Sequence, residues 1–156
     1  MQKLGVFELS EVAQIVGIPA WKAKNWSHGR PIQISPSFRG GKGRGSLSLY
    51  STADIYLMAL AREMYESGFS SGAINSLVKK LEGKSLQDSD KPLMLFYLQA
   101  EHAFVEFVSQ DWLQGKGSWL GSTAGDNKPL VLTLVRIQAL AKRINKRIEE
   151  FKKTGK

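Results

Sequence analysis

The fold is decided by the stretch SEVAQIVGIPAWKAKNW, residues Ser10 to Trp26, which predicts two short helices joined by a tight turn. Ser10 can accept a backbone N–H and begin the first helix. Apolar residues recur at helical spacing up to Gly17, which readily takes the left-handed conformation that ends a helix. Pro19 suits the first turn of the second helix, where its missing N–H costs nothing. The stretch is therefore typical of a helix-turn-helix, whose second helix enters the major groove of DNA; an ordinary pair of antiparallel helices is the alternative.

The charge of the chain is +8, and its distribution indicates a phosphate-facing surface. From Val12 to Ala53 the sequence contains no Asp or Glu. That window carries six cations instead: Lys22, Lys24, Arg30, Arg39, Lys42 and Arg44. We expect the second helix to present Lys22, Lys24 and Asn25 to the major groove. The remaining cations, from Arg30 to Arg44, are expected to hold phosphates or reach the minor groove. A solvated basic face is the alternative.

The composition gives no support to an enzyme. The chain has 156 residues, no cysteine and two histidines, His28 and His102. Disulfides, thiolate metal sites and thiol nucleophiles are excluded, and a histidine-based metal site is not expected. No nucleophile–base pair or carboxylate dyad can be assembled, so we expect no catalysis, no cofactor and no metal. No apolar run is long enough to span a membrane, and we expect a cytoplasmic, bacterial nucleoid-associated protein.

A hairpin and two further helices are predicted after Trp26. The segment from Arg39 to Gly45 alternates glycines and cations and is expected to form the tip of a hairpin whose second strand contains Leu47 and Leu49. A third helix is predicted from Thr52 to Glu66, and a fourth begins at Ser70 or Ser71 and ends near Gly83. The order helix, turn, helix, hairpin, helix, helix would make residues 1–82 one domain.

This half of the chain resembles the MerR-type winged helix-turn-helix transcription regulators. The resemblance rests on three short pieces in matching order: Leu9 to Ala13 with Gly17 and Ile18, then Leu49 to Ile55, then Gly68 to Ser70 followed by Ile74. It implies a DNA-binding domain that acts as a homodimer through a C-terminal helix. It also implies that RNA polymerase or a small effector is a further partner.

The second half, residues 83–156, is predicted to be a small α+β region. Two apolar runs, Leu93 to Leu98 and Ala103 to Val108, favour a two-stranded hairpin, with one continuous helix as the alternative. A long amphipathic helix is expected at about 132–152, where six residues at 3-4 spacing form a seam: Leu134, Ile137, Ala141, Ile144, Ile148 and Phe151. We expect this seam to pair two copies; packing on the chain's own strands is the alternative.

Taken together, the sequence predicts an α+β protein with an N-terminal winged helix-turn-helix. The expected function is sequence-specific binding of double-stranded DNA by a homodimeric transcription regulator. The alternative is a winged-helix architectural or adaptor protein that bends DNA or recruits a partner without strong sequence specificity.

Overall fold

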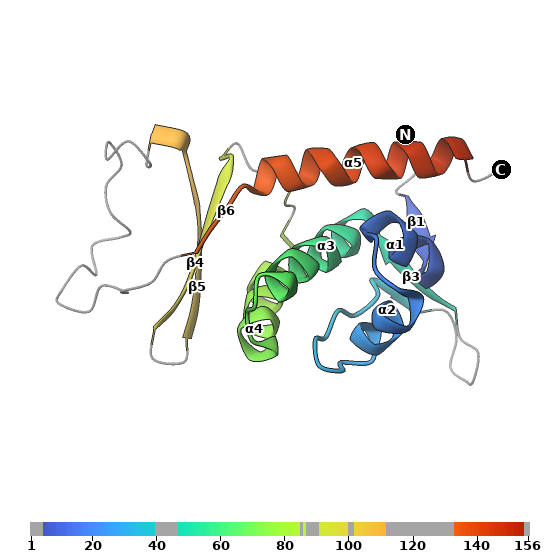
Figure 1. Ribbon diagram of the computed structural model, residues 1–156, viewed down its shortest axis with the longest axis horizontal. Helices are drawn as coiled ribbons and strands as arrows, with labels where there is room; N and C mark the ends of the chain where they lie inside the picture. The colour runs from blue at the N-terminus through green and yellow to red at the C-terminus, as the bar shows by residue number, and fades with distance from the viewer. Residues whose placement is uncertain are drawn as a thin grey trace.

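The computed structural model describes residues 5–39, 47–84, 86, 91–99, 102–111 and 133–154. In these residues the chain is a mixed α+β fold with five helices and two small antiparallel sheets, so the predicted α+β class is confirmed (Figure 1). The elements follow in the order β1 (Val6–Glu8), α1 (Leu9–Val16), α2 (Ala20–Ser27), β2 (Phe38–Arg39), β3 (Ser48–Ser51), α3 (Thr52–Glu66), α4 (Ser71–Leu81), β4 (Leu93–Gln99), β5 (His102–Val108), β6 (Thr133–Val135) and α5 (Ile137–Thr154).

The first two helices form where the sequence predicted them. The prediction that Ser10 caps the first helix was wrong: α1 begins at Leu9, its N-cap residue is Glu8, and the N–H of Glu8 donates to the Glu11 carboxylate at 2.7 Å. Gly17 ends α1 in the left-handed conformation, with φ 78°, as predicted. Pro19, with φ −59°, immediately precedes α2. The turn between the helices is therefore fixed by the two residues whose backbone preferences it requires.

The first sheet has the order β1–β3–β2 and holds the base of the predicted hairpin. Between α2 and β2 the side chains of Ile32 and Ile34 are buried, but the segment pairs with no described strand because its hydrogen bonds go elsewhere. The N–H of Ile34 donates to the carbonyl oxygen of Trp26 at 3.1 Å. The side chain of Asn75 in α4 bonds the backbone at Pro31 and at Gln33, at 3.0 and 2.8 Å. These bonds join the end of α2 to α4 and give backbone groups of the segment their hydrogen-bond partners.

Helix α3 occupies the centre of the molecule, and its bounds are those predicted (Figure 1). Its N-terminus is capped by Ser51, whose hydroxyl accepts from the N–H of Asp54 at 3.2 Å. Ser70 caps α4 in the same way through the N–H of Ala73 at 3.2 Å. Both caps use a side-chain oxygen to satisfy an N–H that the helix itself leaves free.

The second sheet has the order β5–β4–β6. The predicted hairpin of two strands is confirmed: β4 and β5 pair antiparallel, with Leu93 opposite Val108 and Gln99 opposite His102. Met94 and Phe96 join the main core, whereas alternate residues of β4 form a smaller cluster on the other face. This alternation is what a strand with both faces covered requires.

Helix α5 lies lengthwise over α1 and α3 on the side away from α2 (Figure 1). The predicted start at 132 was wrong, because Leu134 belongs to the short strand β6, pairs with Leu95 and is 39% exposed. Four of the six seam residues are buried in the same cluster as α1 and α3: Ile137, Ala141, Ile144 and Ile148. Phe151 packs against that cluster. The chain's own core thus buries most of the seam, which favours packing within one chain; the pairing of two copies through it stays a prediction.

Two arginines join α5 and α3 to the end of α1. Arg147 donates through Nη1 to the carbonyl oxygens of Ile15 and Val16, at 3.2 and 3.0 Å, and Arg62 donates to the same Val16 oxygen at 2.7 Å. Cations at a helix C-terminus are favoured by its partial negative charge. A Cβ on Gly17 would lie 3.0 and 3.1 Å from the two guanidinium nitrogens, so this corner needs glycine for space as well as for conformation.

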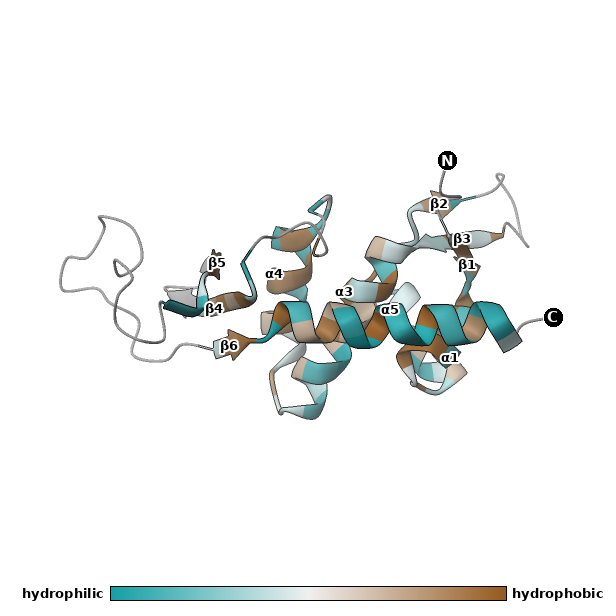
Figure 2. Ribbon diagram, turned by 90° about the horizontal axis from the view of Figure 1, so that it is seen from above, coloured by the Kyte–Doolittle hydropathy of each residue, from teal (hydrophilic) through white to brown (hydrophobic). Residues whose placement is uncertain are grey.

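The main hydrophobic cluster includes residues from both sides of the predicted boundary at 82, among them Leu60, Phe96 and Ile144. Figure 2 shows that the outward face of α5 is largely hydrophilic. Among the described residues, none of the helices combines the length and apolarity that a membrane crossing needs.

Candidate nucleic-acid interface

Helix α2 has one buried side and one exposed side. Ala23 and Trp26 are buried in the core. The exposed side chains are those of Trp21, Lys24 and Asn25 in the helix and of His28 directly after it. Trp21 keeps 65% of its surface exposed. Sequence reasoning identified Lys24 and Asn25 but missed Trp21 and His28, although the spacing 21, 24, 25, 28 is that of one helical face. This α2 face therefore offers an aromatic ring, an ammonium, an amide and an imidazole.

Lys22 does not belong to the α2 face. Its ammonium lies 4.5 Å from the ring centroid of Tyr65, at the end of α3, and 5.6 Å from that of Trp26. These are cation–π distances, and they hold the side chain against the body of the protein. The structure therefore separates Lys22 from Lys24 and Asn25, the two residues with which it was predicted to face the major groove.

The His28 ring is fixed by the helix it follows. Its Nδ1 lies 2.7 Å from the carbonyl oxygen of Lys24 and 3.1 Å from the hydroxyl oxygen of Ser27. Because a carbonyl oxygen only accepts, Nδ1 must carry the proton. The other nitrogen, Nε2, is then an acceptor in the neutral ring and a second donor in the protonated ring.

A polar hollow of about 410 Å³ separates the end of α2 from the hairpin, and we call it the α2–hairpin hollow. It is lined by Leu9, Lys24, Ser27, His28, Pro36, Arg39, Ser48 and Tyr50. The lining contains two cations, an imidazole and no carboxylate. Such a combination attracts anions and gives no charge partner to a cation.

Tyr50 contributes a buried hydroxyl to this hollow. The side chain is 0% exposed, and its Oη has no hydrogen-bond partner among the described residues. The nearby Ser27 hydroxyl donates instead to the carbonyl oxygen of Lys24 at 2.7 Å. An unpaired buried hydroxyl costs about 1–3 kcal/mol.

The pKa of Tyr50 is raised above its ordinary value of 10.0, first of all by burial of the ring. The charge of Asp54 also raises this pKa, and that of Arg39 lowers it. At neutral pH the group is therefore a phenol with a proton to donate.

The hairpin is fastened to α3 by one carboxylate. Asp54 accepts through Oδ2 from the backbone N–H groups of Ser37 and Ser51, at 3.0 and 2.8 Å. The hydroxyl groups of Ser37 and Ser51 lie 3.0 Å apart. Arg39, paired with Ser48 in the strand register, is thereby held at the edge of the α2–hairpin hollow.

Of the other predicted contact residues, Arg30 is exposed just after α2, and its N–H donates to the carbonyl oxygen of Asn25 at 2.9 Å. Lys42 and Arg44 lie outside the described residues. Three of the predicted residues, Lys24, Asn25 and Arg39, are thus brought to one corner of the protein.

Within the part of the chain that the structure describes, no group of three or more His, Cys, Asp or Glu side chains could hold a metal ion. A scan against models of known protein families and a search of curated proteins found no match to the chain. The functional assignment therefore rests on the α2 face and the α2–hairpin hollow.

Proposed function

We propose that residues 6–81 form a MerR-type winged helix-turn-helix and that the chain is a sequence-specific regulator of transcription that binds double-stranded DNA. The order of elements from β1 to α4 supports this reading, with β2 and β3 as the wing. The observation that carries the proposal is the α2–hairpin hollow, where cations and an unpaired tyrosine hydroxyl lie beside an exposed helix face.

In this proposal the α2 face reads base edges. Asn25 is suited to adenine, which it can bind through two hydrogen bonds, and Lys24 to the acceptors of guanine. Trp21 supplies an apolar surface for a thymine methyl group. Lys22 has no part in the reading, because it is held against Tyr65.

The hollow receives a backbone phosphate. Arg39, at the edge of the hollow, neutralises the charge of this phosphate. Phosphate contacts of this kind fix the register of a protein on the duplex and carry no sequence information. Arg30, Lys42 and Arg44 extend the contact along the backbone, as the sequence predicts.

In this proposal a single chain binds its DNA site, because the helical seam that was expected to pair two copies is buried in the chain's own core. A homodimer, as the resemblance implies, must therefore use another surface. The form of the binding site decides this point: an inverted repeat indicates two copies, and a single short site indicates one.

The experiment is selection of bound duplexes from a random pool, followed by affinity measurements on the selected duplex and a scrambled one. We expect a consensus, and we expect Asn25→Ala to weaken binding to the consensus more than to the scrambled duplex. Arg39→Ala should weaken both alike. Lys142→Ala is the matched control, since it removes an exposed lysine from α5, on the side away from α2.

A pool that yields no consensus, together with bending of any duplex, would contradict sequence-specific regulation and favour an architectural role. Equal weakening of both duplexes by Asn25→Ala would show that α2 does not read the bases.

A further inference from the structure

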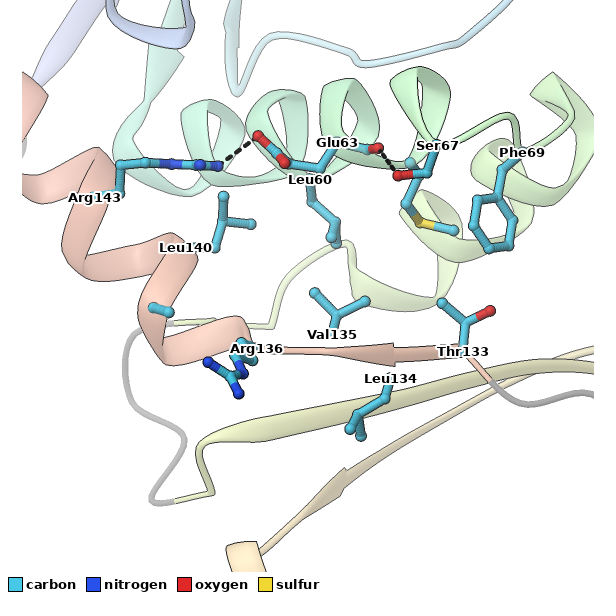
Figure 3. Close-up of a pocket in the computed structure, with 12 residues that line it drawn as sticks. Leu60, Glu63, Ser67, Phe69, Thr133, Leu134, Val135, Arg136, Leu140 and Arg143 are labelled. Atoms are coloured by element: carbon cyan, nitrogen blue, oxygen red, sulfur yellow. Dashed lines mark hydrogen bonds and ion pairs between the residues drawn. The ribbon is translucent and has the colours of Figure 1, made fainter. Parts of the chain in front are cut away.

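A second hollow, of about 460 Å³, lies where α3, the turn after it, β6 and the start of α5 meet (Figure 3). We call it the α3–α5 pocket. Its walls are mainly apolar, from Leu60, Met64, Phe69, Val135, Ala139 and Leu140. Leu60 from α3 and Val135 from β6 point toward each other across it. Its volume falls in the range of small-molecule sites, which are typically about 300–1,000 Å³.

The polar groups at the edge of this pocket differ in whether they already have a hydrogen-bond or ion-pair partner. Arg143 is paired with the carboxylate of Glu63, so their charges offset each other. Ser67 donates its hydroxyl proton to the carbonyl oxygen of Glu63 at 2.8 Å. Arg136 is exposed, lines the pocket, and its side chain makes no hydrogen bond or ion pair with any described residue. Among the described residues, the guanidinium of Arg136 therefore has no partner and can bind a ligand at this pocket.

We propose that the α3–α5 pocket binds a small amphipathic carboxylic acid. Its hydrocarbon part lies between Leu60, Val135 and Leu140, and its carboxylate accepts hydrogen bonds from Arg136. A guanidinium binds a carboxylate through two parallel hydrogen bonds, which a neutral head group cannot reproduce. Among the lining charges only Arg136 is uncompensated, and this selects an anion over a cation.

The position of the pocket links it to the DNA-binding half. Arg143 at its edge precedes, by one turn of α5, the Arg147 that donates to the last carbonyl oxygens of α1. A ligand wedged between α3 and α5 shifts the base of this contact, and α1 in turn packs on α2. This consequence, a change in DNA affinity, rests on the proposed function; binding of the ligand does not.

The test uses the full chain and octanoate, with 1-octanol as the neutral probe of equal chain length, in isothermal titration calorimetry without DNA. Three variants are compared. Ala139→Phe fills the pocket from an exposed position, Arg136→Gln removes the free guanidinium, and Lys142→Gln removes an exposed charge of α5 that does not line the pocket. Thermal unfolding of each variant verifies that it is folded.

We expect octanoate to bind the wild type and Lys142→Gln alike, and at least tenfold more weakly to Arg136→Gln and to Ala139→Phe. Octanol should bind the wild type and Arg136→Gln equally. No heat of binding with the wild type would overturn the proposal, and so would octanoate binding that a folded Ala139→Phe leaves unchanged. Unchanged octanoate affinity in Arg136→Gln would overturn the carboxylate assignment. Because these titrations contain no DNA, their failure is separate from failure of DNA binding.

Discussion

The substitution Ile144→Ala tests whether α5 belongs to the core of a single chain. Ile144 is 1% exposed and belongs to the cluster that includes residues of α1 and α3. The change removes one methylene and two methyl groups, worth about 2.4 kcal/mol at about 0.8 kcal/mol each. A cavity adds to this loss, and such substitutions typically cost about 2–5 kcal/mol. We expect the free energy of unfolding to fall by about 3 kcal/mol.

The assay is urea denaturation at two protein concentrations that differ about fifty-fold. If α5 packs within one chain, the urea concentration at the unfolding midpoint of the wild type does not depend on protein concentration. If the seam pairs two copies, that midpoint rises with protein concentration. Lys142→Ala, exposed on the same helix, should change stability by less than about 0.5 kcal/mol. A loss below about 1 kcal/mol for Ile144→Ala would refute the reasoning.

Three further substitutions test the turn after α1, the hydrogen bonds of Asp54 and the buried hydroxyl of Tyr50. Gly17→Ala should cost at least about 1–2 kcal/mol in thermal unfolding, because it puts a Cβ on a left-handed residue and against the Arg62 and Arg147 guanidinium groups; a neutral effect would contradict this. Asp54→Ala should cost about 2–3 kcal/mol, since it leaves two backbone N–H groups without their acceptor, and unchanged stability would contradict that role. Tyr50→Phe should not destabilise the protein at pH 7, because the lost hydroxyl has no partner there. Above pH 10 the unfolded tyrosine ionises while burial keeps the folded one protonated, so stability of the wild type should fall with rising pH more steeply than that of Tyr50→Phe; parallel curves from pH 9 to 11 would contradict the raised pKa.

The helix ends were predictable because each depends on a local preference. Gly17 ends α1, Ser51 caps α3 and Ser70 caps α4, and each does so through its own backbone or side chain. The β4–β5 hairpin was predictable from two apolar runs. In contrast, β6 was missed, because Leu134 continues the 3-4 spacing of the helix and pairs with a strand about forty residues earlier.

What covers an apolar face could not be predicted from its periodicity. The spacing around Ile144 shows that α5 has an apolar side, and a second copy or the chain's own α1 and α3 would satisfy it equally. The candidate site likewise depends in part on contacts between residues that are distant in the sequence. Lys24 and Asn25 follow from their place in the helix, but the capture of Lys22 by Tyr65 depends on a contact across forty-three positions. The unpaired hydroxyl of Tyr50 likewise exists only once the fold is formed.

The salt dependence of binding to a fluorescent duplex, measured by anisotropy, tests the central claim most directly. The four cations that the proposal places on phosphates, Arg30, Arg39, Lys42 and Arg44, predict a slope of log affinity against log salt of about −3.6 per chain, at about −0.9 for each phosphate contact. Arg39→Ala should reduce the slope by about 0.9, and Lys142→Ala should leave it unchanged. A slope near zero, or absence of binding at low salt, would contradict the account.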